Sequence, residues 1–235
     1  MNHTLATRLR LGTKKAHTIA ENVGFVQCFL KGVVEKQSYR KLVANFYFIY
    51  CALEEAIENH HAHPAVSKIN FPQLHRKQAL EQDLLFYYGE HWQEQIQPSP
   101  VAVVYVKRIQ QLSESKPEQL IAHAYTRYLG DLSGGQIFKG IAQRAMNLSD
   151  GKGTAFYEFA EIPNTKAFKA SYRQVLNELP LSIEDCEQIV EEANYAFGLV
   201  TQLYQELEGN LIKAIGLMLY NSLAHRFSSP KFAVN

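Results

Sequence analysis

The chain has 235 residues, of which 46% are hydrophobic and 20% charged, and its formal net charge is +1. This composition is typical of a globular protein with one large core or two small ones. The nearly balanced charge, together with a basic region that carries no recognised binding motif, argues against a nucleic-acid-binding protein.

No segment predicts a membrane anchor or an export signal. The longest uncharged apolar run near the end, AIGLMLYNSLAH from Ala214, is too short to cross a bilayer. The N-terminus, MNHTLATRLR, lacks the apolar core of a signal peptide. We therefore expect a soluble, cytoplasmic protein. Because no low-complexity linker divides the chain, we expect one domain over residues 1–227, followed by a tail over 228–235.

Charged residues are unevenly distributed along the chain. Residues 1–50 carry eight Lys or Arg against two acids, whereas residues 181–210 carry seven acids and no Lys or Arg. This pattern fits two solvated faces, or a basic surface that attracts an anionic ligand or an acidic protein partner.

Cys28, Cys51 and Cys186 form no C-x-x-C pattern, so we expect them to be reduced and buried.

Apolar residues recur at helical spacing, and strand-like alternation is almost absent, which predicts an all-α fold. The first helix has one apolar face formed by Leu5, Leu9, Gly12, Ala16 and Ile19. Ser38 is the expected N-cap of a second helix, which keeps helical register through Leu42, Phe46, Ile49, Leu53 and Ile57. A third helix runs from Pro72 to Gly89, and Ser99-Pro100 begins a fourth.

The second half of the chain also has the spacing of helices. A long helix is expected from Pro117 to about Met146, then the loop NLSDGKG and a helix over 165–178. Ser182 and Asp185 resemble a capping box for a helix that ends at Gly209, and one more short helix is expected after it.

The long helix contains the unusual stretch YLGDLSGGQ, residues 128–136, with three glycines in six residues. Each glycine inside a helix costs about 0.5–1 kcal/mol relative to alanine. Gly130 and Gly134 leave the backbone bare, so a flat ligand can lie directly against it. Asp131 lies among these glycines, and Arg127, one turn earlier, is placed to pair with it.

Two basic stripes have the spacing of ligand-binding helix faces. Arg10, Lys14, His17 and Glu21 share one stripe of the first helix. A surface histidine of this kind is often only solvated, but it also suits a metal ligand whose second ring nitrogen is oriented by a carboxylate. Lys169 and Arg173 stand one turn apart on a later helix. The pair forms either a solvated face or half of a clamp for a ligand with two carboxylates.

A histidine cluster, His60, His61 and His63, leaves a further alternative open. Glu58 and His61 form an E-x-x-H pattern, as in ferritin-like di-iron proteins, but a second E-x-x-H on another helix is absent. The cluster is otherwise a solvated group at a helix end. A helical bundle with purely structural histidines and glycines is the remaining reading.

Three segments carry a resemblance to a known family: TKKAHTIAEN (13–22), LHRKQALEQDLLFYYG (74–89) and AHAYTRYLGDLSGGQ (122–136). Together they resemble haem oxygenase, and the match runs in order from about Leu5 to Asn210. The chain resembles the soluble cyanobacterial or plastid type in particular. The membrane-tethered relatives carry a hydrophobic C-terminal anchor, and we expect none in this sequence.

The resemblance implies that haem b lies between a proximal helix and a glycine-rich distal helix. His17 would then be the axial iron ligand, supported by Glu21. Gly130 and Gly134 would let the distal backbone approach the haem. Asp131 would hold a water network, with Arg127 and Tyr50, that supplies protons to the reacting dioxygen.

Further positions follow from the resemblance alone. The residues matched to the surroundings of the haem propionates are Arg10, Lys14, Tyr125, Lys169 and Arg173. Ser133 is expected to bind the cofactor, and Phe197 is matched to the distal pocket. The chain departs from many relatives after the distal motif, where IFKGIAQ places Phe138 and Gly140, and Gly140 adds a further weak point to that helix.

The implied reaction is the oxidative cleavage of haem at the α-meso carbon to biliverdin, carbon monoxide and ferrous iron. Nothing in the sequence resembles a flavin, nicotinamide or iron–sulfur site, so electrons must come from an external donor. The basic N-terminal region would suit an acidic ferredoxin. A haem sensor or carrier without turnover is the rival reading, although such a protein has no need for Asp131.

Overall fold

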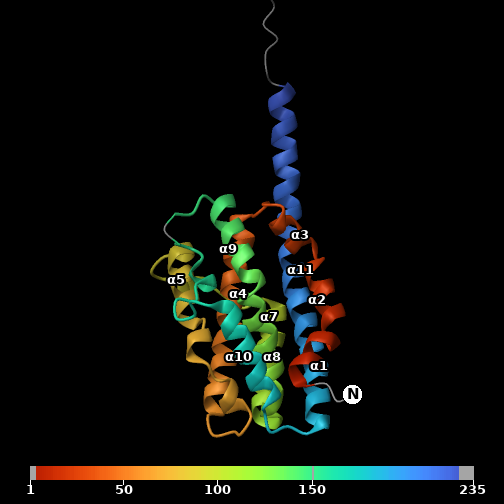
Figure 1. Cartoon of the computed structure of the whole chain (residues 1–235). Coiled ribbons are helices and arrows are strands. Elements are labelled where there is room, and N and C mark those ends of the chain that lie inside the picture. Colours follow the sequence, from red (N-terminus) through yellow and green to blue (C-terminus); the bar gives the residue numbers. More distant parts are fainter. Residues whose placement is uncertain (1–3, 150, 228–235) are drawn as a thin grey trace, which may run out of the picture.

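The computed structural model describes residues 4–149 and 151–227, with side chains as far as Glu208. Within these residues the regular structure is helical and no strand occurs (Figure 1), which confirms the predicted all-α class. The α-helices are α1 (Leu5–Gly12), α2 (Lys14–Glu21), α3 (Gly24–Leu30), α4 (Lys36–Asn59), α5 (Lys77–Tyr88), α6 (Trp92–Gln95), α7 (Pro100–Ser115), α8 (Leu120–Asp131), α9 (Gly134–Ala145), α10 (Thr165–Asn177) and α11 (Ile183–Phe227). The 3-10 turns are η1 (Val66–Ile69), η2 (Pro72–Leu74), η3 (Pro117–Gln119) and η4 (Ala155–Tyr157). No described helix is both long and apolar enough to traverse a bilayer.

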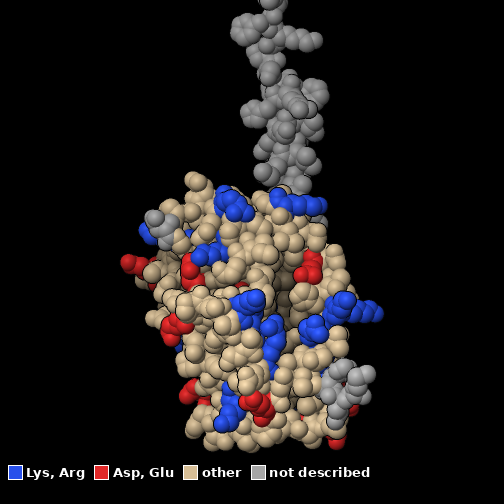
Figure 2. Space-filling view, viewed as in Figure 1, with Lys and Arg blue, Asp and Glu red and all other residues tan. Residues whose placement is uncertain are grey.

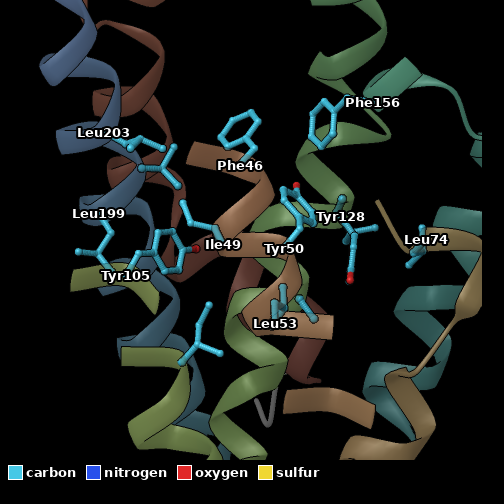
Figure 3. Packing of buried hydrophobic residues seen from close by; sticks show 14 of the residues in the cluster. Phe46, Ile49, Tyr50, Leu53, Leu74, Tyr105, Tyr128, Phe156, Leu199 and Leu203 are labelled. Carbon is cyan, nitrogen blue, oxygen red and sulfur yellow. The ribbon is translucent and has the colours of Figure 1, made fainter. Parts of the chain in front are cut away.

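The core is built around α4, α7, α8 and α11, which pack against one another. Figure 3 shows its centre, where α4 contributes Phe46, Ile49, Tyr50 and Leu53 to a buried cluster that also contains Tyr105, Tyr128, Phe156, Leu199 and Leu203. Burying each large side chain of this kind contributes about 1.5–3 kcal/mol. The remaining helices and the η4 segment pack around this centre. The walls of the site described below come from both sets, since α4, α8 and α11 line it together with α1, α2, α9, α10 and η4.

Most predicted helix boundaries have the expected chemistry. The Ser99 hydroxyl accepts a hydrogen bond from the amide of Ala102 at 3.3 Å and caps α7. The capping box at α11 is also present, since Ser182 N donates to Asp185 at 2.9 Å and Asp185 N to Ser182 at 3.1 Å. Gly89 ends α5 with φ of +83°, a conformation that favours glycine.

Two predicted helix starts were wrong. The N-cap of α4 is Glu35, whose carboxylate accepts from the amides of Gln37 and Ser38 at 2.7 and 2.6 Å. Ser38 itself is buried inside the first turn. The third helix begins at Lys77 instead of Pro72, because Pro72 opens only a 3-10 turn that an extended His75 interrupts.

The predicted first helix is two helices, α1 and α2, which meet at Thr13. The break changes the buried face: Ile19, predicted to lie in the core, is 51% exposed, and Ala20 is buried in its place. Gly12 ends α1 at a close approach to α11, where an added Cβ would lie 2.5 Å from Val190 Cγ1. A side chain at this position would force the two helices apart.

The long glycine-bearing helix also divides, into η3, α8 and α9. The break between α8 and α9 lies at Leu132 and Ser133, and Ser133 has a non-helical backbone with ψ of −82°. By contrast, α11 runs past Gly209 to Phe227, so the predicted helix end there was wrong (Figure 1). One glycine costs only about 1 kcal/mol in a helix interior and does not end a helix without further stop signals. The predicted tail over 228–235 lies outside the described residues.

Candidate functional site

A cavity of about 740 Å³ opens between the α1–α2 arm and helices α8, α9 and α10. Figure 2 shows a hollow on this face with Lys and Arg side chains on both sides of it. The volume lies in the range of small-molecule and cofactor sites. Of the predicted site residues, the structure brings to the lining Arg10, Lys14, His17, Glu21, Tyr125, Arg127, Gly130, Asp131, Ser133, Gly134, Lys169, Arg173 and Phe197.

The predicted stripe on the α1–α2 arm is preserved across the helix break. Thr13 N donates to Leu9 O at 3.0 Å and His17 N donates to Thr13 O at 2.9 Å, so helical hydrogen bonding continues through the junction. Arg10, on α1, and Lys14, on α2, therefore face the same cavity as His17.

His17 lies on α2 with its imidazole held between two neighbours. Its Nδ1 is 3.3 Å from Glu21 Oε2, and its side chain is 53% exposed. The ring of Phe197, on α11, lies edge-on to it with centroids 5.6 Å apart. Because Glu21 engages Nδ1, Nε2 remains available as a metal ligand.

Phe197, matched by the family resemblance to the distal pocket, lines the cavity. Its ring also contacts the imidazole of His17. Helical spacing within α11 does not reveal this, because the contact is between helices that are far apart in sequence.

The three glycines of the distal stretch have different surroundings. A Cβ added to Gly130 would meet no heavy atom within 4 Å, and one at Gly134 only the Phe138 ring at 3.9 Å. Both glycines line the cavity, so their bare backbone gives a flat ligand room for close approach. A Cβ on Gly135 would instead lie 3.0 Å from the ring of Tyr157. Gly135 is therefore required for packing.

Asp131 is buried at the end of α8 and is bound by two side chains. The Tyr50 hydroxyl donates to Oδ2, and Arg127 Nη2 donates to Oδ1 at 3.3 Å. Arg127 Nε also donates to the Tyr50 oxygen at 3.0 Å, and its guanidinium lies 4.5 Å from the centroid of the Phe46 ring. Tyr50 itself does not line the cavity. Its hydrogen bond to Oδ2 holds the Asp131 carboxylate in position.

Burial and neighbouring charges together set the pKa values of Asp131 and Arg127. Loss of solvent raises the pKa of Asp131, although the Arg127 charge and the Tyr50 hydrogen bond favour the ionised form. Burial likewise disfavours the charge on Arg127, yet Tyr50 and Asp131 hold its pKa above the ordinary value. The result is a charged guanidinium that anchors a carboxylate at the cavity wall.

A second buried network supports the wall formed by η4. Arg76 Nη1 donates to the main-chain oxygens of Phe156 and Glu158 at 3.3 and 2.5 Å. Asp83 accepts from the amide of Phe156 at 2.9 Å. Burial raises the pKa of Asp83 to about 6 and that of Glu54, which accepts from Arg76 N at 2.5 Å, to about 7.

The sequence does not reveal this support. Arg76 and Asp83 lie in the segment 74–89 that carried part of the family resemblance, but their partners are more than seventy residues away in the chain. The lining also contains residues for which the sequence predicts no ligand-binding role: Thr13, Ala20, Val26, Leu42, Phe46, Thr126, Leu129, Gly135, Ile137, Phe138, Phe156, Tyr157, Val200 and Tyr204. Most of them read as ordinary core positions from their spacing.

The α10 pair lies across the mouth from the α1–α2 arm. Lys169 Nζ donates to the Ser133 hydroxyl at 3.0 Å, which ties α10 to the junction of α8 and α9. Arg173 Nη1 donates to the main-chain oxygen of Lys169 at 3.4 Å. Both cations line the cavity, as does Tyr125. Cations on two separate walls are suited to a ligand with two carboxylates.

The histidine cluster has structural partners. His60 Nε2 is 2.8 Å from Ser113 O, and His63 Nδ1 accepts from the amide of Val66 at 3.2 Å. Glu58 accepts from Asn70 at 2.9 Å. Among the side chains described, those of residues 4–149 and 151–208, no group of three or more potential His, Cys, Asp or Glu metal ligands is present.

The cysteines within the described residues are unpaired. Cys28, Cys51 and Cys186 are partly exposed, so the prediction that they are buried was wrong.

Comparisons with known proteins identify the family of the chain. The family model described as heme oxygenase matches residues 3–206. The chain is 66% identical over 226 residues to "Heme oxygenase 1" of Nostoc sp. (strain PCC 7120), covering 96% of this chain and 95% of that protein. It is 60% identical over 228 residues to "Heme oxygenase 1" of Synechocystis sp. (strain PCC 6803), covering 97% and 95%.

Solved structures show the same relationship. Haem oxygenase-1 from Synechocystis sp. PCC 6803, in complex with haem, superposes with a TM-score of 0.91 at 60% identity and covers 94% of this chain and 100% of that chain. Haem oxygenase-2 from the same organism, in complex with haem and NO, superposes with a TM-score of 0.90 at 48% identity. This match covers 95% of this chain and 93% of that chain. The chain is therefore an enzyme of the haem oxygenase family, of the cyanobacterial and plastid type.

Proposed function

We propose that the chain cleaves haem at the α-meso carbon to biliverdin, carbon monoxide and ferrous iron, using dioxygen and external electrons. The observation that carries the proposal is the cavity in which His17 faces the bare backbone of Gly130 and Gly134, with Asp131 beside them. When bound, haem supplies the activation of dioxygen at its iron and the carbon that is attacked.

The residues present fit haem. His17 Nε2 would hold the iron, while Glu21 at 3.3 Å from Nδ1 keeps the ring in one orientation. The room above Gly130 and Gly134 accepts the opposite face of the macrocycle. At the mouth, cations on two walls would meet the propionates: Arg10, Lys14, Lys169 and Arg173, with Tyr125 and Ser133 beside them.

Asp131 would manage proton supply in the cavity. Tyr50 donates to one carboxylate oxygen and Arg127 to the other, and the remaining lone pairs can accept hydrogen bonds from water. A carboxylate held in this way positions water by hydrogen bonding and does not itself deliver a strong acid to the reacting dioxygen. Asp131 would thereby hold water at the cavity wall as a weak proton donor.

Electrons would come from an acidic donor protein, with ferredoxin as the expected one. Support comes from the Lys and Arg side chains along both sides of the hollow (Figure 2). A positive rim around the entrance steers a negatively charged partner towards the cavity edge.

The test is an aerobic turnover spectrum of the protein loaded with one equivalent of haem and supplied with enzymatically reduced ferredoxin. We expect the Soret band to decay while the red band of biliverdin rises and carbon monoxide is released. A Soret band that persists under these conditions, with haem bound through a histidine, would identify a haem carrier or sensor instead.

A further inference from the structure

A second cavity, of about 520 Å³, lies on another part of the molecule. It is enclosed by α4, α11 and the segment from the end of α5 to the start of α7, and it shares no lining residue with the first cavity. Its volume is within the range of small-ligand pockets. Nothing in the proposed haem chemistry uses it.

Arg40 is a preorganised cation in this lining. Its guanidinium lies 4.7 Å from the centroid of the Tyr88 ring, and the Tyr88 hydroxyl donates to the Arg40 main-chain oxygen at 3.2 Å. The hydroxyl bond fixes the ring beneath the guanidinium, so the cation is held in place before any ligand arrives. Arg40 Nε is buried and has no hydrogen-bond acceptor among the described residues. A buried donor without an acceptor costs free energy that an anionic ligand would recover.

Lys41 adds a second positive charge to the lining. Within the side chains described as far as Glu208, neither Arg40 nor Lys41 forms an ion pair. The acidic side chain of the lining, Glu206, is already engaged at the start of α7. It accepts from the Ser99 hydroxyl at 2.5 Å and from the Val101 amide at 3.1 Å.

The uncharged part of the lining is mixed. Its polar side chains are Asn45, Gln95, Gln97 and Ser99, and its apolar or aromatic ones are Ala44, Tyr88, Ile96, Pro100 and Leu207. Ile96 and Leu207 are buried at 4% and 3% exposure, and Pro100 completes this side of the pocket with Ala44. A pocket with a fixed guanidinium at one part of its wall and apolar side chains at another is suited to an amphipathic anion.

We propose that this cavity is a second ligand site, which binds a small aromatic or apolar monocarboxylate. The carboxylate pairs with Arg40 and Lys41, and the apolar body packs against the more accessible Tyr88 and Pro100 of the same lining. A second carboxylate on the ligand is disfavoured, because Glu206 contributes negative charge to the same lining. The site is independent of the haem cavity, so it stands or falls separately from the proposed activity.

The test uses the haem-loaded protein, so that the first cavity is filled, and isothermal titration calorimetry with 2-naphthoate as the probe. We expect one binding site with a Kd below about 1 mM. The neutral analogue 2-naphthylmethanol should bind at least about tenfold more weakly, since it lacks the charge that pairs with the guanidinium.

Variants locate the site. Arg40→Gln should weaken 2-naphthoate binding by about tenfold or more, whereas Arg40→Lys, which keeps the charge, should weaken it less. Lys107→Gln is the matched control, because Lys107 is an exposed cation on α7 outside this lining and should leave the affinity unchanged. Circular dichroism and thermal unfolding of each variant establish that it is folded. The proposal is overturned if 2-naphthoate shows no saturable binding, or if folded Arg40→Gln and Arg40→Lys both bind it as tightly as the parent protein.

Discussion

The imidazole of His17, on α2, lies edge-on to the ring of Phe197, on α11, with centroids 5.6 Å apart and planes inclined at 75°. Glu21 approaches the same imidazole from one turn along α2. Two helices therefore set the orientation of the proposed iron ligand: α2 through the carboxylate of Glu21, and α11 through the ring of Phe197. Because the His17 side chain is half exposed, its role as iron ligand can be tested without unfolding the protein.

His17→Ala should remove the axial ligand and leave the fold largely intact, because the side chain is half exposed. We expect the ferric haem complex to lose its histidine-ligated spectrum and its affinity to fall, with unchanged circular dichroism. His91→Ala is the control, since His91 is an exposed histidine outside the cavity lining. An unaltered ferric spectrum in His17→Ala would exclude His17 as the ligand.

Asp131→Ala should retain haem binding and lose biliverdin formation, because the carboxylate that positions water is gone. Asp131→Asn should behave similarly, since an amide has only one acceptor oxygen. Tyr50→Phe leaves Asp131 bound by Arg127 alone and should give a smaller loss. Single-turnover spectra quantify all three variants. Undiminished biliverdin yield in Asp131→Ala would place the proton supply elsewhere.

The two glycines Gly130 and Gly135 should respond in opposite ways to alanine. Gly130→Ala meets no atom within 4 Å in the protein, and replacing a helical glycine should raise the free energy of unfolding of the haem-free protein by up to about 1 kcal/mol. The new methyl group occupies the space proposed for haem, so haem affinity and turnover should fall.

Gly135→Ala brings a Cβ to 3.0 Å from Tyr157 and should lower the free energy of unfolding, by roughly 1–3 kcal/mol. Urea unfolding of the haem-free proteins, with haem titrations beside it, separates the two effects. Equal destabilisation by both substitutions would contradict the assignment of Gly130 to the ligand cavity.

Glu54 should make stability depend on pH. Burial raises its pKa from 4.5 to about 7, so the folded protein holds a proton that the unfolded chain releases between these values. The stabilisation is complete below the unfolded pKa and is lost as the pH rises through about 7. From pH 6 to 7 the free energy of unfolding should fall by up to about 1 kcal/mol through this group.

Glu54→Gln should remove this slope, measured as urea unfolding at a series of pH values. The matched control is Glu55→Gln, an exposed neighbour on α4 that should keep the parent slope. Asp83, whose pKa is raised to about 6, adds a smaller slope of the same sign. This slope is present in the parent protein and in both variants, so the difference between the curves reports Glu54. Parallel curves for the parent protein and Glu54→Gln would show that Glu54 does not titrate in this window.

The sequence by itself determined the helical class, several helix ends and the main chemistry of the site. Local rules suffice for these features: Ser99 before Pro100, the Ser182 and Asp185 pair, and the spacing of Lys14, His17 and Glu21 are set within one or two helical turns. The family resemblance added Asp131 and the cavity glycines as a ligand wall, which spacing alone left open.

Only the tertiary structure decided that Gly130 has open space beside it whereas Gly135 lies against Tyr157, and that Phe197 contacts His17. It also decided the attachment of η4 by Arg76 and Asp83. These relationships join residues far apart in the chain, and their energies come from burial and close packing between helices. A periodic pattern identifies the buried face of one helix, but it carries no information about which side chain of another helix meets it.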